Sequence, residues 1–318
     1  MEKRSLGRSG LEVTTLTLGG NVFGWTADKE QSFAVLDAYV AAGGNFIDTA
    51  EVYSKWAPGN PGGVSETIIG QWHKARGNRD KIIITTKVAY QTPKGLSRQY
   101  IQQAVEASLR RLQTDYIDLY QSHSDDKETP LEETLETYAE LIKQGKVRAI
   151  GASNYSAERL AEALRVSEQH GYPRYESLEP LYNLYERASY EQGLEKVCRE
   201  QGLGVISYLA LASGFLTGKY RSEADLNKSA RGGSIKEYLN PRGFRILQAL
   251  DEVAKEYNAT PAQISLAWLI ARPSITSPIA SATSVEQLEQ LTRATELKLD
   301  AAAIARLDQA SAEDSVKA

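Results

Sequence analysis

Short apolar runs alternate with amphipathic segments eight times between residues 15 and 281, and this alternation restricts the possible folds more than any other feature. The runs are TLTLGG, NFID, KIIITTK, YIDLYQ, VRAIGAS, YESLEP, GVISYL and ITSPIAS. They are apolar at consecutive positions, which is typical of strands in a parallel sheet that helices cover on its outer face. Eight strand and helix repeats in strict order predict an α/β fold in which the sheet closes into a (β/α)8 TIM barrel.

Several further segments refine this expectation. The clearest helical pattern covers 97–113, and the segments TPLE and TPAQ predict two helices with Thr at the N-cap and Pro at the first position. A doubly wound sheet would need a GxGxxG fingerprint, and GGNVFG at 19–24 does not supply one. Residues 3–13 predict a β-hairpin that caps one end of the barrel. Residues 213–240 predict an irregular, mobile loop over a bound anion. No linker or repeat divides the chain, so we expect one domain over residues 1–318.

Charge and composition exclude several classes of partner. The chain has 37 Lys and Arg against 41 Asp and Glu, a net charge of -4 that does not predict nucleic-acid binding. One cysteine, Cys198, and three histidines without metal-ligand spacing predict no bound metal. No apolar run approaches the length of a membrane span and no signal-peptide pattern begins the chain, so we expect a cytoplasmic protein without membrane contact. The oligomeric state stays open.

Polar residues end most of the predicted strands. In a TIM barrel the active site is built from the carboxyl ends of the strands and the loops that follow them. A carboxylate, an ammonium, an imidazole and a phenol that meet at one rim therefore predict a catalytic site. The residues at these positions are Asp48, Lys87, His123, Ser153, Asn154, Glu179 and Tyr208.

Several longer segments match a known family in content and in order. GGNFIDTAEVYS, IIITTK, DYIDLYQSH, GKVRAIGASN, LYNLYER, LASGFLTGKY and TPAQISLAWLI followed by SVEQLE resemble the aldo-keto reductase superfamily over nearly the whole chain. The resemblance implies an NAD(P)H-dependent oxidoreductase that reduces an aldehyde or ketone to an alcohol. It also implies a catalytic tetrad of Asp48, Tyr53, Lys87 and His123.

The tetrad has a physical rationale. Reduction of a carbonyl needs a hydride at carbon and a proton at oxygen, and Tyr53 is the expected proton donor. A free phenol has a pKa of about 10. An ammonium on Lys87, held by Asp48, is expected to lower the pKa of Tyr53 toward the working pH. His123 is expected to be neutral beside that cation and to orient the substrate carbonyl.

The resemblance also implies a dinucleotide site, with NADP(H) favoured and NAD(H) possible. The nicotinamide would stack on Tyr208, and the pyrophosphate would lie under the glycine loop near Lys219. The implied carboxamide contacts include Glu179, where the family usually has Gln. A carboxylate accepts a hydrogen bond from an amide NH2 but cannot donate one. The full set of implied cofactor contacts is Gly20, Asn21, Asp48, Ser153, Asn154, Glu179, Tyr208, Leu209, Leu211, Ser213, Gly214, Lys219, Ser281, Thr283 and Gln287.

The adenosine end departs most from the family pattern. Ser281 replaces the common Gly or Lys, Gln287 stands where Arg often binds a 2′-phosphate, and Gln290-Leu291 replaces a usual Glu-Asn pair. The cofactor preference is therefore an open question for the sequence. The expected contacts of a 2′-phosphate, with weak discrimination, are Thr283, Ser284 and Gln287.

The candidate substrate pocket is rich in aromatic residues, which favours an apolar or cyclic carbonyl compound. Its expected members are Asn21, Phe23, Trp25, Trp56 and Tyr90, although a Trp can equally fill the core. Two other functions compete. One is a nucleotide sensor with slow turnover, similar to the potassium-channel β-subunits of the same superfamily. The other is a barrel hydrolase with paired carboxylates, for which Glu179 is the one available second acid.

Overall fold

The computed structural model describes residues 1–313, and a sheet of eight parallel strands forms its centre. These strands are β3 Thr17–Gly19, β4 Phe46–Asp48, β5 Ile83–Val88, β6 Ile117–Ser122, β7 Val147–Ser153, β8 Tyr175–Glu179, β9 Gly204–Val205 and β10 Ile279–Ala280. Each of the eight predicted runs overlaps one of them, and β5 and β6 each extend one residue beyond the run. Their order in the sheet is β10-β3-β4-β5-β6-β7-β8-β9, so strands that are consecutive in the chain are neighbours in space.

Backbone hydrogen bonds close this sheet into a barrel. The amides of Thr276 and Ser277 donate to the Val205 carbonyl at 2.9 and 3.1 Å, and the Ile279 amide donates to the Ser207 carbonyl at 2.8 Å. These bonds join the chain around β9 to β10, which pairs with β3 on its other side. The (β/α)8 TIM barrel predicted from the sequence is confirmed.

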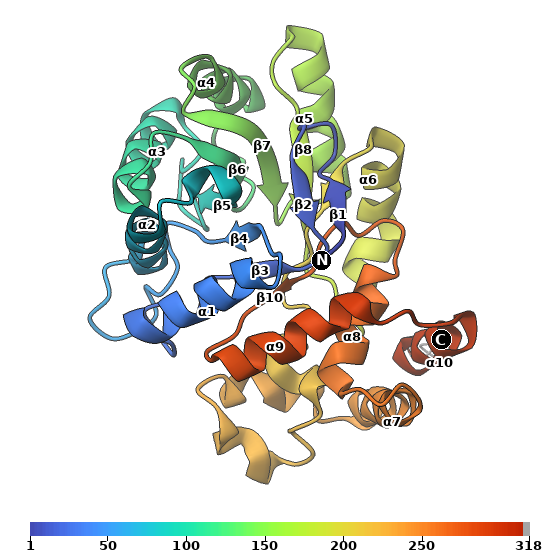
Figure 1. The fold of residues 1–318 in the computed structure, drawn as a ribbon. Helices are drawn as coiled ribbons and strands as arrows, with labels where there is room; N and C mark the ends of the chain where they lie inside the picture. The colour runs from blue at the N-terminus through green and yellow to red at the C-terminus, as the bar shows by residue number, and fades with distance from the viewer. Residues whose placement is uncertain (314–318) are drawn as a thin grey trace.

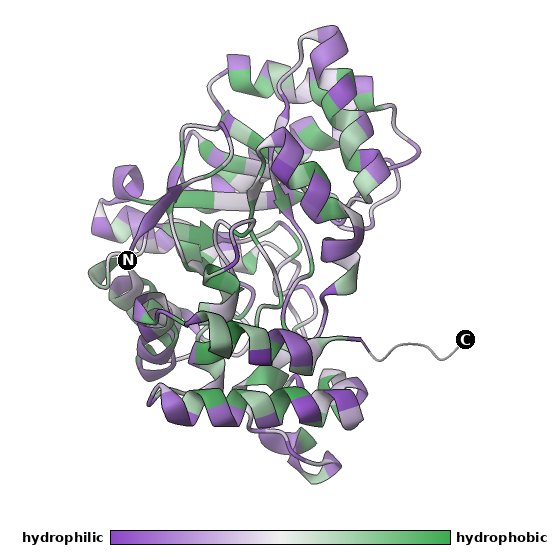
Figure 2. Ribbon diagram, turned by 90° about the vertical axis from the view of Figure 1, so that its right-hand side faces the viewer, coloured by the Kyte–Doolittle hydropathy of each residue, from purple (hydrophilic) through white to green (hydrophobic). Residues whose placement is uncertain are grey.

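Helices surround the strands (Figure 1). They are α1 Lys29–Ala41, α2 Val64–Arg76, α3 Arg98–Leu112, α4 Leu131–Lys143, α5 Ala157–His170, α6 Glu195–Gln201, α7 Pro241–Glu256, α8 Pro261–Ile270, α9 Val285–Arg293 and α10 Ala301–Ser311, with single-turn helices η1 Arg79–Lys81, η2 Tyr190–Leu194 and η6 Ala294–Glu296. Polar and apolar residues alternate along the helices (Figure 2), as expected when one face packs on the barrel and the other meets solvent. Within residues 1–313, no helix combines the length and the apolar character that a membrane span needs.

The start of α8 follows the predicted capping pattern, whereas the start of α4 does not. The Thr260 hydroxyl accepts from the Gln263 amide at 3.3 Å, and the Gln263 side chain accepts from the Thr260 amide at 2.9 Å. The expectation for the TPLE segment is wrong by one residue, because Pro130 holds the N-cap position. The Thr129 hydroxyl donates instead to the Asp126 carboxylate at 2.7 Å. A local charged acceptor competes successfully with the helix backbone for this hydroxyl.

The predicted hairpin closes the amino end of the barrel. Strands β1 Lys3–Ser5 and β2 Glu12–Thr14 pair antiparallel, and in Figure 1 they lie in front of the barrel strands. Apolar side chains of the hairpin insert among the first inward-facing residues of the strands. This apolar plug consists of Leu6, Leu11 and Val13 of the hairpin with Phe46, Ile83, Leu119, Ala149, Ile206 and Ile279 of the barrel. Because the plug fills the amino end, the carboxyl end of the barrel is the open end.

The segment expected to be irregular contains short helices. They are η3 Ala212–Thr217, η4 Glu223–Lys228 and η5 Gly232–Tyr238. The side chains of Phe215, Tyr220 and Ile235 are fully buried. The expectation of an irregular segment over 213–240 is therefore wrong, because it forms packed single turns with buried side chains. Its mobility and the bound anion stay predictions.

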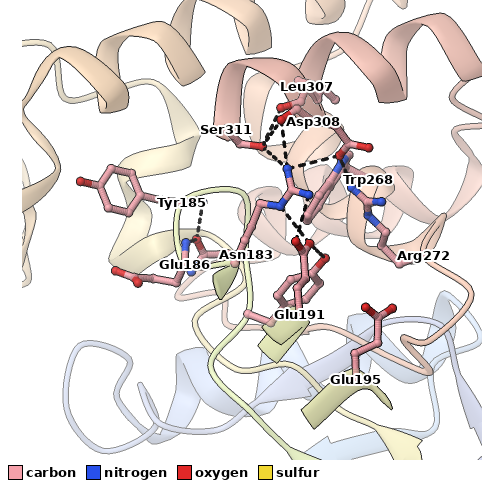
Figure 3. A network of polar contacts seen from close by, with 12 residues as sticks. Asn183, Tyr185, Glu186, Glu191, Glu195, Trp268, Arg272, Leu307, Asp308 and Ser311 are labelled. Atoms are coloured by element: carbon pink, nitrogen blue, oxygen red, sulfur yellow. Dashed lines mark hydrogen bonds and ion pairs between the residues drawn. The ribbon is translucent and has the colours of Figure 1, made fainter. Parts of the chain in front are cut away.

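A network of polar contacts that includes Glu191, Asp308 and Ser311 ties the chain after β8 to the last helices (Figure 3). Arg187 Nη1 donates to the Asp308 carbonyl at 3.0 Å and to the Ser311 hydroxyl at 2.8 Å, and its Nε donates to Glu191 at 2.9 Å. The guanidinium also lies over the Trp268 ring of α8, 5.5 Å from its centroid. Helix α10 is thereby anchored to the segment that follows β8.

We expect Leu6→Ala to lower the free energy of unfolding by about 2–5 kcal/mol, because it empties part of the apolar plug. Leu6 is fully buried, whereas Phe244 on α7 is 41% exposed. Phe244→Ala is the control and should cost less than about 1 kcal/mol. Urea denaturation followed by tryptophan fluorescence measures both changes. Equal losses in the two variants would contradict a hairpin that seals the barrel.

Candidate active site

The strand register brings the expected acid and base residues to the carboxyl end of the barrel. Asp48 and Glu179 are the last residues of β4 and β8, and Lys87 is the penultimate residue of β5. His123 follows the end of β6 directly, and its amide donates to the chain at the end of β5. Tyr53 lies in the turns that follow β4. One rim of the barrel therefore holds all five residues.

Lys87 is the centre of this cluster. Its ammonium is fully buried, forms an ion pair with Asp48 and donates to the Tyr53 hydroxyl at 2.9 Å. It also donates to the Thr49 carbonyl at 3.1 Å. The Tyr53 hydroxyl in turn donates to Asp48 Oδ2 at 2.9 Å. The phenol thus lies between an ammonium and a carboxylate, within hydrogen-bond reach of both.

A second carboxylate contacts the same ammonium. Glu179 Oε1 lies 3.2 Å from Lys87 Nζ, and Gln121 Nε2 donates to Glu179 Oε2 at 2.6 Å. Burial and the nearby Asp48 raise the pKa of Glu179 to about 8, and burial also raises the pKa of Asp48. Burial by itself lowers the pKa of Lys87, but the two carboxylates and Tyr53 outweigh it and raise that pKa well above its ordinary value. Two carboxylates around one ammonium therefore favour retention of a carboxyl proton to a higher pH than an isolated Glu would allow.

The expected lowering of the Tyr53 pKa is not what the site produces. Burial raises the pKa of Tyr53 well above 10, and the carboxylates of Asp48 and Glu179 raise it further. Lys87 does act in the expected direction, because its ammonium lowers this pKa, but its effect is smaller than that of burial and of Asp48. Tyr53 is therefore a neutral phenol at neutral pH.

His123 matches the expectation of a neutral imidazole. Burial and the Lys87 ammonium hold the pKa of His123 well below its usual value of 6.5. Its Nδ1 atom is buried and has no hydrogen-bond partner among residues 1–313. The ring packs against Tyr90 with 4.7 Å between centroids and lies 6.1 Å from the Tyr53 ring. A neutral imidazole beside the phenol can donate to a carbonyl oxygen from the ring nitrogen that carries its proton.

A cavity of about 1030 Å³ opens above this cluster, and most of the residues expected at the site line it. Lys87 lies beneath its floor, buried under Tyr53 and Asp48. The expected residues that line the cavity are Asn21, Asp48, Tyr53, Trp56, Tyr90, His123, Ser153, Asn154, Glu179, Tyr208, Leu209, Leu211, Ser213, Gly214, Lys219, Ser281, Thr283 and Gln287, together with Gln290 and Leu291.

Besides Lys87, three expected residues do not reach the cavity lining. Phe23 is fully buried in the core, where the turn after β3 directs its side chain. Gly20 lies below the surface, because a Cβ at this position would come within 2.7 Å of Ser65 Oγ and 2.9 Å of the Asp48 carbonyl. Trp25 stands edge-to-face with Trp56, at 5.8 Å between centroids, and supports that lining residue from outside.

The residues expected to hold a nicotinamide ring form a connected platform. Tyr208 Oη donates to Asn154 Oδ1 at 2.8 Å, and Asn154 Nδ2 donates to the His123 carbonyl at 2.8 Å. The Ser153 hydroxyl donates to the Glu179 carbonyl at 2.9 Å. The Glu179 side chain takes no part in this platform, because Lys87 and Gln121 occupy its carboxylate. This departure from the usual Gln therefore acts on the catalytic cluster.

The loop after β9 and the start of α9 have the backbone geometry of anion sites. Ser213 and Gly214 are left-handed, at φ 56° and 99°, which turns consecutive amides toward one side of the loop. At α9, the Ser284 hydroxyl accepts from the Gln287 amide at 3.3 Å and caps the helix. Gln287 Oε1 accepts from the Thr283 amide at 3.0 Å. The amide NH2 of Gln287 remains available as a donor at the mouth of the cavity.

Sequence reasoning missed two residues of the site. Gln121 holds Glu179, and its position at the end of β6 is a signal that could have revealed it. Arg231 lines the cavity from the 213–240 segment, which has no regular pattern from which to infer a direction. Within residues 1–313, no group of three or more His, Cys, Asp and Glu side chains could hold a metal ion.

A TIM barrel with an acid–base cluster at the carboxyl end of its strands is the architecture of a barrel enzyme. Residues 15–312 match the Aldo/keto reductase family. The chain is 35% identical to the Uncharacterized oxidoreductase YrpG of Bacillus subtilis over 311 residues, which cover 94% of this chain and 93% of that protein. It is 33% identical to the Aldo-keto reductase YhdN of the same organism over 93% of this chain and 89% of that one. The chain belongs to the aldo/keto reductase family of oxidoreductases.

A relative with a different description matches to a similar extent. The Probable voltage-gated potassium channel subunit beta of Arabidopsis thaliana is 32% identical over 310 residues, which cover 93% of this chain and 92% of that protein. Similarity to this chain therefore extends both to proteins described as oxidoreductases and to proteins described as channel subunits.

We expect Glu179→Gln to change how stability depends on pH. Glu179 has a folded-state pKa of about 8, against about 4.3 in an unfolded chain. Between these values the folded protein binds the extra proton, so the natural chain loses stability as pH rises. Gln cannot lose a proton, so the stability of the variant relative to the natural chain should increase by up to about 1.4 kcal/mol per pH unit.

Urea denaturation at pH 5.5, 7.0 and 8.5 measures this difference. Glu168→Gln is the matched control, because Glu168 is exposed on α5 and far from the lysine in the barrel. Parallel pH curves for the natural chain and Glu179→Gln would show that Glu179 is ionised throughout and contradict the extra proton.

Proposed function

We propose that this protein reduces an aldehyde or ketone to an alcohol with NADPH, with Tyr53 as the proton donor. The observation that carries the proposal is the position of the Tyr53 hydroxyl, which contacts Lys87 and Asp48 at 2.9 Å each and lines the floor of the large cavity. A proton donor in such a reaction must lie within hydrogen-bond reach of the carbonyl oxygen it serves.

The residues present fit a dinucleotide. One cavity joins Tyr53 and His123 to the start of α9, so a long ligand can reach both. Burial raises the pKa of Tyr208 to about 12, which keeps its ring neutral for stacking. The left-handed turn at Gly214 and the amino end of α9 both favour anionic oxygens. These groups would hold nicotinamide, pyrophosphate and adenosine phosphate respectively.

A bound reduced nicotinamide would supply the hydride, and the chain supplies the rest of the chemistry. The carbonyl carbon gains the hydride and its oxygen gains the Tyr53 proton, which gives the alcohol. The negative charge left on Tyr53 is stabilised by the Lys87 ammonium at 2.9 Å. Neutral His123 donates to the same carbonyl oxygen and stabilises its developing charge. Solvent then returns a proton to Tyr53.

We expect Tyr53→Phe to lower kcat by about 10²–10⁴-fold, because the acid is lost while the shape of the pocket stays. The affinity for NADPH should change little, since the ring remains in place. Loss of NADPH absorbance with 4-nitrobenzaldehyde measures turnover, and fluorescence quenching measures cofactor binding. Tyr116→Phe is the control, because Tyr116 contacts Arg79 away from the cavity. An active Tyr53→Phe variant would exclude this residue as the acid.

We expect NADPH to bind more tightly than NADH, and Gln287→Arg to widen the gap about tenfold through a charge-assisted contact with the 2′-phosphate. The natural Gln287 can offer one neutral amide donor there. Fluorescence titration with each cofactor gives both dissociation constants. Gln248→Arg adds the same charge on the exposed face of α7 and should leave the ratio unchanged. Tighter binding of NADH by the natural chain would refute the assignment of this phosphate contact.

A nucleotide sensor is the second candidate function, and similarity to the Arabidopsis channel subunit supports it. A sensor would bind NADPH tightly and oxidise it in a single slow turnover. An enzyme would turn over repeatedly on at least one aldehyde of a panel. Comparing the single-turnover rate with steady-state kcat distinguishes the two, because a sensor retains the oxidised cofactor.

A further inference from the structure

We propose that Glu179, acting through Lys87, supplies the proton that restores Tyr53 after each reduction. The inference rests on the proposed reductase function and names the group that carries a proton from solvent to that same site. Glu179 stands where the family usually has Gln, so the inference concerns a property of this chain.

The Lys87 ammonium has more acceptors around it than hydrogens. An ammonium offers three hydrogens. Four oxygens contact Nζ, namely one oxygen of Asp48, the Thr49 carbonyl at 3.1 Å, the Tyr53 hydroxyl at 2.9 Å and Glu179 Oε1 at 3.2 Å. The first three accept the lysine hydrogens, so Glu179 Oε1, at the longest contact, receives none. Oε1 is therefore the oxygen on which a carboxyl proton can reside.

Asp48 is less suited to hold that proton, because both of its oxygens accept hydrogen bonds. Its Oδ1 accepts from Lys87, and its Oδ2 accepts from the Tyr53 hydroxyl at 2.9 Å. Hydrogen bonds donated to a carboxylate favour its ionised form. Glu179 receives one such bond, from Gln121 Nε2 to Oε2 at 2.6 Å. Of the two carboxyl groups, Glu179 is the one that can keep a proton.

A buried amide fixes the Glu179 carboxyl group. Gln121 Nε2 holds Oε2, and Gln121 Oε1 accepts in turn from the Ser177 hydroxyl at 3.3 Å. A Cβ on Gly151 would lie 2.2 Å from Ser177 Oγ and 2.8 Å from Gln121 Oε1, so the amide has room only because residue 151 is glycine. With Oε2 held in this way, Oε1 stays directed at Lys87.

The charges around Glu179 favour its protonated form. The titratable groups that face it are Lys87 on β5, Asp48 on β4, Tyr53 after β4 and Tyr208 after β9. Burial raises the pKa of Glu179 most and Asp48 raises it further, whereas Lys87 lowers it. Burial raises the pKa of both phenols as well. The carboxyl group therefore keeps its proton to a higher pH than an isolated Glu, yet releases it more readily than either phenol.

The transfer balances in atoms and in charge. Tyr53 gives its proton to the carbonyl oxygen and becomes a phenolate. The phenolate takes a proton from Lys87 Nζ at 2.9 Å, and the lone pair left on that nitrogen takes the proton of Glu179 Oε1 at 3.2 Å. The products are a neutral phenol, an ammonium and a Glu179 carboxylate, and no group changes its oxidation state. Solvent then protonates Glu179, which lines the cavity.

The test follows single-turnover oxidation of NADPH by 4-nitrobenzaldehyde from about pH 6 to about pH 10. The natural chain should slow about 10-fold as Glu179 ionises, because the carboxylate has no proton to give and its charge opposes a phenolate on Tyr53. Oxidation of 4-nitrobenzyl alcohol with NADP+ should accelerate over the same range, since the reverse transfer needs the carboxylate. Glu179→Gln should abolish both pH dependences and reduce the aldehyde about 10-fold more slowly than the natural chain near pH 6.

Two further measurements distinguish proton transfer from a structural role. In mixtures of H2O and D2O, the reduction rate of the natural chain should vary nonlinearly with the deuterium fraction, because several protons move. The rate of Glu179→Gln should vary linearly, because only the Tyr53 proton moves. Infrared difference spectra of the cofactor-free protein between the same pH limits should show the loss of a carboxyl band that Glu179→Gln lacks.

Two other variants complete the test. Glu168→Gln, on the exposed face of α5, should keep the natural pH profile. Gln121→Met keeps Glu179 but removes the hydrogen bond to Oε2, which lowers the pKa of Glu179 in the natural chain. Its profile should therefore keep the fall in rate and move the midpoint to higher pH. Thermal melting establishes that each variant is folded, and Gln121→Met tests the transfer even if Glu179→Gln is not.

Several results would overturn the inference. Equal pH profiles and equal deuterium dependence in the natural chain and Glu179→Gln would do so and leave the reductase function standing. A change confined to NADPH affinity would also do so, because it would assign Glu179 to the cofactor. A natural chain that reduces no aldehyde would overturn the proposed function, and the proton transfer with it.

Discussion

The buried ammonium of Lys87 is the interaction on which the site depends. Removing a charged amine from water costs several kcal/mol even after the protein relaxes. Asp48, Glu179 and the Tyr53 hydroxyl offset that cost, and they come from the ends of two strands and one turn. The same contacts that allow the charge to be buried therefore fix the separation of β4, β5 and β8 at the open end. Catalytic geometry and local stability share one set of atoms.

The barrel divides its two ends between packing and chemistry. At the amino end the hairpin inserts apolar side chains among the first inward-facing residues of the strands. At the carboxyl end polar side chains meet, and Lys87, Asp48 and Glu179 satisfy one another there. The Arg187 network holds α10 and α8 against the chain that follows β8. That anchoring lies just beyond Glu179, so it limits movement of the strand end that carries the second carboxylate.

The sequence predicted those features that depend on period and position along the strands. The apolar runs predicted all eight strands and the hairpin. The convergence of Asp48, Lys87 and His123 was predicted because the carboxyl ends of barrel strands meet at one rim. The direction of the shift in the Tyr53 pKa was not predicted, because burial has the largest effect on it and the sequence argument considered only Lys87. The prediction of Thr129 as an N-cap was wrong because its hydroxyl donates to the Asp126 carboxylate. Arg231 was not predicted as a cavity residue, because the 213–240 segment has no hydrophobic period from which the direction of a side chain could be inferred.

The groups that line the cavity limit which substrates can approach Tyr53. The raised pKa of Glu179 reduces the negative charge of the Lys87 cluster, so the cavity floor repels an anion less than two fully ionised carboxylates would. The Arg231 guanidinium lines the same cavity and lies over the Trp25 ring, which stands edge-to-face with Trp56. Trp56 and Tyr90 also line the cavity, so a substrate that reaches Tyr53 meets aromatic rings beside a cation.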